Sequence, residues 1–366
     1  MPKHASGLTQ ATANSKRRLS VNASASMQAQ PGSAWRMPVD AFVAHWAKMT
    51  ERRLILGIDG GGSKTAVRIA EVAHDGELRV LGEGFGGPSN VRAVGRAHAE
   101  INLNVAVDAA HEAAATAGEK IHFAVLGLAG SSLPDIKAFI GSWAGERALA
   151  DSIDIVHDAD PVLAAGVPDG VGIALIVGTG SAAIGCNSDG GRVVTGGWGH
   201  WFGDAGSGYD LGRRALAAIA EATDGVGPST LLVERILLQL HVSNPREMLM
   251  QLGRSGDMSR EIAALAPIVL HAAEQGDEVA AKIVVTAARG AAQLVRATAA
   301  KLDIASDVSL AIAGGIVCSN TKYRETMLDE LRALGIEPAE VAVVHEPVEG
   351  CLLMARKRML EAARSR

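Results

Sequence analysis

The chain has 366 residues, of which 48 % are hydrophobic and 20 % are charged, a composition typical of a globular protein with room for two hydrophobic cores. Its formal net charge of −5 argues against a basic face for nucleic acid or anionic membranes, and no apolar run approaches the roughly 18 residues of a membrane span. The widely spaced Cys186, Cys318 and Cys351 predict reduced thiols in a cytoplasmic protein rather than a disulfide framework.

Residues 1–50 differ in composition from the rest of the chain. Ser, Ala, Gln and Asn dominate residues 1–33 without any hydrophobic period, which predicts a disordered leader. Translation that begins at Met49 is an alternative, because MTERRLILGIDGGG reads like a natural protein start. In either case we expect the folded protein to begin near residue 51.

From residue 54 the hydrophobic pattern alternates between strands and helices. The predicted strands are 54–58, 66–72, 79–83, 123–128, 153–157, 173–177, 182–186, 308–313 and 341–344, with a helix at 91–117, a long helix after residue 277 and a terminal helix. Both halves open with a strand, a glycine-rich turn and a second strand, which suggests an internal duplication. The layout predicts an α/β protein with mixed sheets, divided into domains at 51–170 and 171–366, the second with a helical insertion.

The first glycine-rich turn is Asp59-Gly60-Gly61-Gly62-Ser63-Lys64. Its three glycines let the backbone approach a ligand closely and direct successive N–H groups toward an anion. The aspartate, at a strand end, is placed to hold Mg²⁺ directly or through water. An ordinary hairpin turn is the alternative for a lone triple glycine. The turn is not a Walker A loop, because GxxxxGK[ST] is absent.

The second turn, Gly178-Thr179-Gly180-Ser181, offers the same backbone donors and two hydroxyl groups. Each turn alone is an unspecific signal. Two such turns that face each other across a cleft would hold a polyphosphate from both sides, and we expect this arrangement. A third element, Gly314-Gly315, follows a buried strand and leaves room for a flat ligand, although packing at a strand-to-helix turn also requires glycine.

Asp158 follows the strand at 153–157, in the segment His157-Asp158-Ala159-Asp160. An acid at a strand end of an α/β cleft is well placed to accept a proton from a hydroxyl group. A helix N-cap is the alternative for Asp158, and Asp160 is interpreted as complementing the helix dipole.

The loop at 196–208 is dense in glycine, which indicates that its backbone passes close to a ligand or to another segment. It carries Trp198 and His200, side chains of the kinds that pack on sugars and hydrogen-bond to them, and a further acid, Asp204. The loop is therefore a candidate sugar-binding segment, with a purely structural loop as the alternative.

These elements, in this order, resemble the N-acetylglucosamine kinase and BadF/BadG/BcrA/BcrD ATPase group of the actin-like ATPase superfamily. The resemblance spans about residues 54–358, and its most specific part is GGWGHWFGDAGSGY at 196–209. The two phosphate segments match at IDGGGSKT and GTGS, and the adenosine segment matches at AGGIVCSN. One departure is Ala205, because the family usually has glutamate there, and the effect of this change stays open.

The resemblance implies two actin-like, ribonuclease H-like domains with mixed sheets around a cleft that binds ATP and Mg²⁺. It implies phosphorylation of an amino sugar by in-line transfer, with Asp158 as the general base and Asp59 at the metal. The implied nucleotide-binding residues are Gly60, Gly61, Gly62, Ser63, Lys64, Gly178, Thr179, Gly180, Ser181, Gly314, Gly315 and, by a loose match, Ala263. The implied sugar-binding residues are Asn90, Gly130, Asp158, Trp198, Gly199, His200 and Asp204.

N-acetylglucosamine is the expected sugar, because bacterial glucosamine kinases of this group tend to lack the Trp-Gly-His run; glucosamine and N-acetylmuramate stay open. An ATP-driven electron-transfer activator is the alternative from another class, but no cysteine precedes Cys186 to hold an iron–sulfur cluster. A non-catalytic sugar sensor is a third hypothesis, disfavoured by the retained acids and phosphate turns. We expect no nucleic-acid or membrane partner, and a homodimer stays open.

Overall fold

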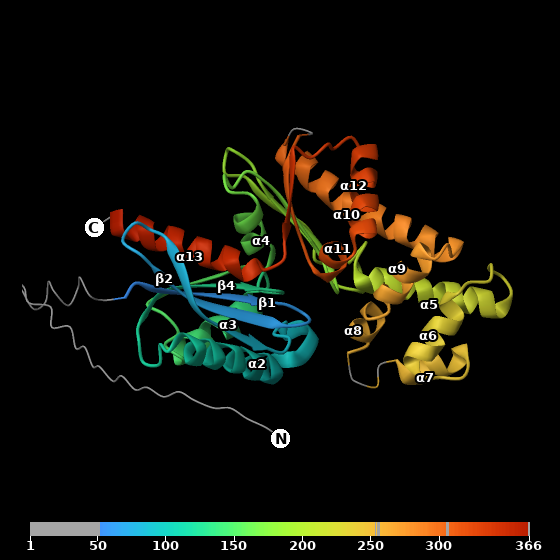
Figure 1. Ribbon diagram of the computed structural model, residues 1–366, viewed down its shortest axis with the longest axis horizontal. Helices are drawn as coiled ribbons and strands as arrows, with labels where there is room; N and C mark the ends of the chain where they lie inside the picture. Colours follow the sequence, from blue (N-terminus) through green and yellow to red (C-terminus); the bar gives the residue numbers. More distant parts are fainter. Residues whose placement is uncertain (1–51, 253, 255–256, 305–306, 365–366) are drawn as a thin grey trace, which may run out of the picture. The chain divides into compact units, whose positions relative to one another are not determined.

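The computed structural model describes residues 52–252, 254, 257–304 and 307–364. The predicted leader at 1–50 and the alternative start at Met49 lie outside these ranges. The described residues form two five-stranded mixed sheets with helices on their faces, which confirms the predicted α/β class (Figure 1). None of the helices in these ranges is long and apolar enough to cross a membrane.

The first sheet has the strand order β3-β2-β1-β4-β5. Its strands are β1 (Leu54–Gly60), β2 (Thr65–Val72), β3 (Leu78–Gly86), β4 (Ile121–Leu128) and β5 (Ser152–His157). Strand β1 runs antiparallel to β2 and parallel to β4, β3 is antiparallel to β2, and β5 is parallel to β4. The central strand β1 is almost entirely buried, because helices cover both faces of the sheet.

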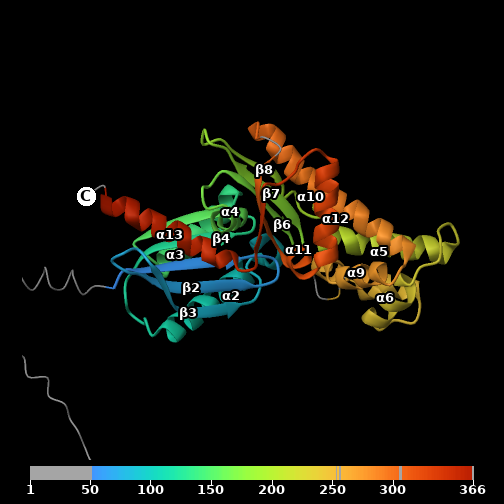
Figure 2. The same cartoon turned by 45° about the horizontal axis from the view of Figure 1, so that its top comes forward.

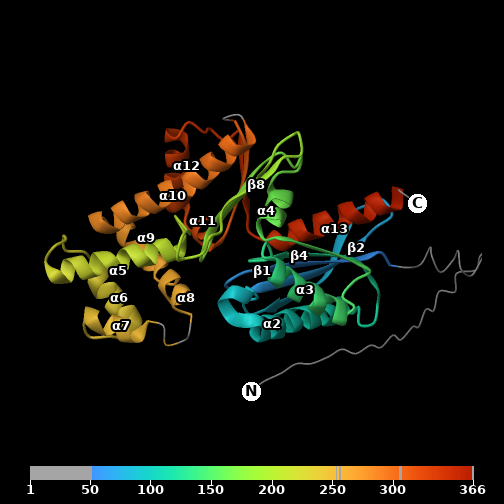
Figure 3. The ribbon, with the colours of Figure 1, turned by 180° about the vertical axis from the view of Figure 1, so that it is seen from behind.

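Alternation along β1 sends its side chains to two different cores. Leu54, Leu56 and Ile58 pack with residues of α2 (Val91–Ala114) and α3 (Pro134–Glu146). Ile55 faces the opposite side and packs with residues of α13 (Pro347–Arg364), which lies on the other face of the sheet in Figures 1 and 3.

The second sheet has the order β10-β9-β6-β7-β8. Its strands are β6 (Gly172–Val177), β7 (Ser181–Cys186), β8 (Arg192–Gly196), β9 (Ser309–Ala313) and β10 (Glu340–Val344). Figure 2 labels β6, β7 and β8 beside the helices. One face packs on α10 (Glu278–Leu302), α11 (Gly315–Ser319) and α12 (Thr321–Ala333), and the other packs on α4 (Ala159–Gly166). The sequence pattern predicts every strand of this sheet except β8, which is a short, half-exposed edge strand.

The chain between β8 and β9 is helical, as expected for an insertion. It forms α5 (Gly208–Asp224), α6 (Leu232–Leu240), the 3₁₀ turn η1 (Pro245–Glu247), α7 (Met248–Gln251), α8 (Met258–Ala263) and α9 (Ala266–Glu274), which lie together in Figure 3. The long helix α10 then begins where predicted, with the Asp277 side chain accepting the Ala280 N–H at 2.7 Å.

The two sheets have the same topology, which supports the predicted duplication. β6 to β10 repeat the order and the strand directions of β1 to β5, so the β6–β7 hairpin is the counterpart of the β1–β2 hairpin. In each half, the helix that follows the last strand packs on the sheet of the other half. Helix α4 follows β5 and packs on the second sheet, and α13 follows β10 and packs on the first. The domain division at 170/171 remains a prediction. It separates the strands of the two sheets correctly, but it assigns α4 and α13 each to the half whose sheet they do not pack on.

Candidate active site

The structure brings the two glycine-rich turns together. Each turn closes the hairpin that opens its sheet, and Ser63 Oγ lies 3.4 Å from Thr179 Oγ1. A side chain added at Gly61 or at Gly178 would meet nothing within 4 Å. The backbone of both turns is therefore open at the place where they face each other, as a bound polyphosphate requires.

Two other glycines of the turns are enclosed by protein, whereas a Cβ at Gly62 would come no closer than 4.0 Å to Thr179. A Cβ at Gly60 would lie 2.2 Å from Ser89 Oγ, and a Cβ at Gly180 would lie 2.8 Å from Asp204 Oδ1. These two positions require glycine because neighbouring side chains occupy the space. Lys64 is exposed at the end of the first turn, and its charge acts on Asp59.

Asp59 lies at the end of β1 among other acids. The pKa of Asp59 is raised to about 7, mainly by burial; the charges of Asp158 and Glu346 add to the increase and that of Lys64 opposes it. The side chain still retains partial exposure. A partly accessible carboxylate beside another acid is a group that a divalent cation would stabilise in its charged form.

Asp158 occupies the N-cap position of α4, but its side chain makes no capping hydrogen bond. Its Oδ1 instead lies 2.8 Å from His157 Nδ1. The Ala159 N–H also lies 3.1 Å from the same nitrogen, which cannot donate to Asp158 and accept from Ala159 at once. Burial opposes the charge on His157, but the hydrogen bond and charge of Asp158 outweigh it and raise its pKa, so we favour the proton on Nδ1 facing Asp158.

Asp160 has a larger role than the helix-dipole interpretation assigned to it. Its Oδ2 accepts the backbone N–H of His157 at 3.0 Å, and its carboxylate pairs with Arg192 at 2.8 Å. It therefore fixes the backbone next to Asp158 and connects it to β8.

The expected sugar-binding residues Asn90, Gly130 and Gly199 lie around one side chain, Arg92. Asn90 Oδ1 accepts the Arg92 backbone N–H at 3.1 Å and lies 3.5 Å from the position of a Cβ on Gly130. A Cβ on Gly199 would lie 3.5 Å from Arg92 Nη2. The Asn90 N–H also donates to Gly61 O at 3.2 Å, so this group of residues adjoins the first phosphate turn. The sequence pattern does not single out Arg92.

The glycine-rich loop is fixed at its base and exposed at its tip. Gly208 N–H donates to Gly178 O at 2.8 Å and Tyr209 N–H to Thr179 O at 3.2 Å, which attaches the base to the second turn. The aromatic side chains of the tip are Trp198, Trp201 and Phe202, with 70 %, 80 % and 88 % of their surface exposed. The last two carry no sequence-based assignment, and His200 packs between the rings of Trp201 and Tyr209.

Asp204 is buried against the second turn. Its Oδ1 accepts the Ser181 N–H at 3.1 Å, and its φ of +63° is the left-handed conformation that non-glycine residues rarely adopt. Burial raises the pKa of Asp204, although the Ser181 hydrogen bond and the charges of His200 and Arg92 oppose the increase. These contacts give Asp204 a role in shaping the phosphate turn, in addition to the sugar-binding role expected from the sequence.

The predicted adenosine residues lie beside the second turn. A Cβ on Gly314, whose φ is +103°, would lie 2.4 Å from Val177 O, whereas one on Gly315 would meet nothing within 4 Å. Gly314 is thus required by packing, and Gly315 faces open space. Ala263 O lies 3.2 Å from the position of a Cβ on Gly208, which brings the loosely matched Ala263 next to the same turn.

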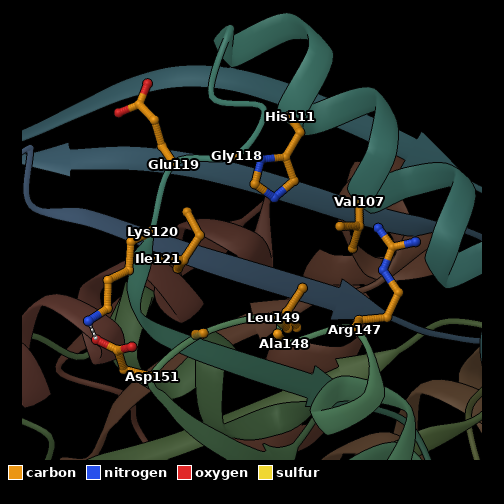
Figure 4. A pocket seen from close by; sticks show the side chains of 11 residues that line it. Val107, His111, Gly118, Glu119, Lys120, Ile121, Arg147, Ala148, Leu149 and Asp151 are labelled. Atoms are coloured by element: carbon orange, nitrogen blue, oxygen red, sulfur yellow. Dashed lines mark ion pairs between the residues drawn. The ribbon is translucent and has the colours of Figure 1, made fainter.

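A separate cavity of about 360 Å³ lies at the opposite end of the first sheet from these residues (Figure 4). Its lining includes Lys120 and Arg147, but both cations already have partners, Lys120 pairing with Asp151 at 3.0 Å and Arg147 with Asp108. None of the predicted site residues lines it.

Comparison with known proteins places the chain in a family. Residues 56–355 match the BadF/BadG/BcrA/BcrD ATPase family. The chain belongs to this family.

Two curated relatives and one solved structure specify the similarity. The chain is 32 % identical to an N-acetylmuramic acid/N-acetylglucosamine kinase from Clostridium acetobutylicum over 309 residues, 83 % of this chain and 98 % of that protein. It is 31 % identical to an N-acetyl-D-glucosamine kinase from Dictyostelium discoideum over 264 residues, 69 % of this chain and 81 % of that one. A proposed N-acetylglucosamine kinase from Chromobacterium violaceum has a similar structure, with a TM-score of 0.66 and 25 % identity over 83 % of this chain and 99 % of the other. These similarities confirm the family resemblance and the predicted fold class.

Proposed function

We propose that this protein is an ATP-dependent kinase that phosphorylates a hydroxyl group of an amino sugar, with N-acetylglucosamine as the expected substrate. The observation that carries the proposal is the meeting of the two glycine-rich turns, with Ser63 Oγ 3.4 Å from Thr179 Oγ1. The names of the two curated relatives support the same activity and the same class of sugar.

ATP is held mainly by backbone groups. The open glycines Gly61 and Gly178 let N–H groups approach the phosphates, and the hydroxyl groups of Ser63 and Thr179 add donors from both turns. Gly315 leaves room for the flat adenosine part. In phosphoryl transfer the protein contributes mainly the positioning of the reactants and the stabilisation of charge. The two turns position the phosphates.

The acids fit a magnesium ion held with the nucleotide. Mg²⁺ uses one or two carboxylates and completes its shell with water and phosphate oxygens. Asp59 is the residue to hold it, directly or through water. Bound there, Mg²⁺ would neutralise negative charge on the phosphates.

Asp158 is the general base. As the sugar oxygen forms its bond to the γ-phosphorus and the bond to the leaving ADP oxygen breaks, the hydroxyl proton passes to the Asp158 carboxylate. The Asp158 carboxylate makes no capping hydrogen bond, so it is not engaged by the helix backbone. Its position is fixed by His157, whose Nδ1 lies 2.8 Å from Asp158 Oδ1. Asn90, Gly130 and the segment from Trp198 to His200 position the sugar.

The electron-transfer alternative is not favoured. It requires several cysteines available for a cluster, but Cys351 is buried, which raises the pKa of its thiol, and its Sγ lies 3.1 Å from Ile58 O. Only Cys186 and Cys318, both half-buried, are left. The homodimer stays a prediction.

An ATP-consumption panel tests the proposal, with glucose, glucosamine, N-acetylglucosamine, N-acetylmannosamine and N-acetylmuramate as acceptors. We assign the C2 acetamide to Asn90 and the loop segment from Trp198 to His200. N-acetylglucosamine should exceed glucose in kcat/KM by about tenfold to a hundredfold, because glucose leaves the polar groups of these residues without a partner. Equal turnover of the two sugars would contradict the assignment of the loop. If no sugar stimulates ATP consumption, the protein is not a sugar kinase.

A further inference from the structure

Arg92 is the cation at the sugar side of the site. Its guanidinium lies against Gly199 of the second half, its Cδ is 3.7 Å from the position of a Cβ on Gly130, and its backbone N–H donates to Asn90. Three of the residues proposed to bind the sugar thus surround it. The Arg92 side chain is exposed overall, so its donors are accessible to a ligand.

Arg92 also lacks a close counter-ion. No acidic residue occurs between Glu83 and Glu100 along the chain, and among the described residues the structure pairs no carboxylate with the Arg92 guanidinium within 4.0 Å. Its charge reaches Asp204 only as a longer-range contribution that lowers the pKa of that acid.

Arg96, one helical turn further along, provides the contrast. The Arg96 guanidinium pairs with Asp135 at 3.6 Å and lies over the Phe139 ring, so it already has a counter-ion. Between the two arginines, Gly95 with a φ of +78° interrupts α2. Arg92 is therefore on a separate helical turn that faces Gly130 and Gly199.

We infer that Arg92 binds a carboxylate carried by the amino sugar, and that the kinase therefore accepts sugars with an acidic substituent on O3, such as N-acetylmuramate. The inference rests on the proposed function. It follows from sugar chemistry, because O3 is next to the C2 acetamide, and Arg92 borders both Asn90 and the loop that we assign to that acetamide. The planar guanidinium can donate two parallel hydrogen bonds to a carboxylate.

The acids of the site favour such a cation for an acidic sugar. When ionised, Asp59, Asp158 and Asp204 would repel a carboxylate on the substrate. Neutral N-acetylglucosamine does not meet this repulsion and has no group that needs the guanidinium. Arg92 should consequently discriminate between the two sugars.

The experiment compares Arg92→Gln, Arg92→Lys and the control Arg96→Gln, with kcat/KM measured for N-acetylmuramate and for N-acetylglucosamine. Arg92→Gln should lower kcat/KM for N-acetylmuramate by about tenfold to a hundredfold, mostly through KM, and change that for N-acetylglucosamine by less than about threefold. For N-acetylmuramate, the kcat/KM of Arg92→Lys should lie between those of the wild type and Arg92→Gln, because lysine keeps the charge but loses the planar pair of donors. Arg96→Gln should leave both sugars unchanged.

The outcomes separate this inference from the proposed function. Turnover of N-acetylglucosamine without turnover of N-acetylmuramate would overturn the inference and leave the kinase activity in place. Equal losses for both sugars in Arg92→Gln would also overturn it, because Arg92 would then act on Asp204 rather than on the substrate. Failure of the wild-type protein with every sugar would refute the proposed function, and the inference with it.

Discussion

The two glycine-rich turns occupy equivalent places in their sheets, between β1 and β2 and between β6 and β7, but their surroundings differ. The first turn follows Asp59, whose neighbour Asp158 lies at the end of another strand of the same sheet. No acid precedes the second turn. Instead Asp204 reaches it from the glycine-rich loop and holds the Ser181 N–H at 3.1 Å.

The contrast indicates that the two halves contribute different groups to the site. The first half contributes the carboxylates that would handle the proton and the metal. The second half contributes backbone whose position is held by packing at Gly314 and by hydrogen bonds from the base of the loop. Changes at the carboxylates of the first half should therefore affect the chemical step, and changes at Gly314 in the second half should affect stability and nucleotide binding.

The largest expected effect is that of Asp158→Asn. The amide has nearly the same size, so folding and sugar binding should survive while the proton acceptor is lost. We expect kcat to fall by about 10²–10⁴, on the order of 3–5 kcal/mol of barrier, with little change in KM. Steady-state ATP consumption with N-acetylglucosamine measures both constants.

The matched control for that variant is Asp154→Asn. Asp154 lies on the same strand β5 and pairs with Arg358 on the surface, so its loss should leave kcat within about twofold. Asp160 is unsuitable as a control, because it holds the His157 backbone and Arg192. If Asp158→Asn keeps more than about a tenth of the wild-type kcat, the base lies elsewhere.

In the second half, Gly314→Ala should act on stability instead. The new methyl group would lie 2.4 Å from Val177 O, at a φ of +103° that side chains rarely adopt. We expect a loss of about 1–3 kcal/mol in the free energy of unfolding and a higher KM for ATP, because the strain falls next to Gly178. Denaturant unfolding measures the first quantity.

Gly315→Ala is the control for this effect. A Cβ at Gly315 meets nothing within 4 Å, so the free energy of unfolding should stay within about 0.5 kcal/mol of the wild type. Equal destabilisation by the two substitutions would show that the glycine pair is needed for backbone flexibility rather than for the contact of Gly314 with Val177.

Local patterns in the sequence were sufficient for much of the fold. The strands that precede the two turns are short apolar runs that end in glycine, and both hairpins form where this pattern occurs. The long helix after Asp277 follows from its apolar period and its cap. Strand β8 was missed, because its five residues are half exposed and show no clear alternation.

The features that remained hidden depend on contacts between distant segments. Gly314 and Gly315 are equivalent in the sequence, and only the position of Val177 distinguishes the packed glycine from the open one. Arg92 and Gly199 are 107 positions apart, and no local pattern indicates that they meet. The exchange of α4 and α13 between the sheets is hidden for the same reason.

The smallest expected effect concerns the histidine beside the base, through the pH dependence of stability. The pKa of His157 is raised above its ordinary value of 6.5, because the hydrogen bond and charge of Asp158 outweigh burial. A raised pKa means that the folded state binds the proton more tightly than the unfolded chain. The resulting stabilisation is fully present below about pH 6.5 and is lost as the pH rises through the folded-state pKa.

His157→Asn should therefore lower the melting temperature more in acid than in base. The amide can still donate to Asp158 but has no charge, so the difference from wild type should reach about 1 kcal/mol, or about 2 °C, near pH 5.5 and shrink near pH 8.5. His74→Asn is the control, since His74 is exposed on the turn between β2 and β3 and should show no such trend. A difference that is constant across this range, or larger in base, would mean that His157 is neutral in the folded protein. Its Nδ1 would then accept the Ala159 N–H instead of donating to Asp158.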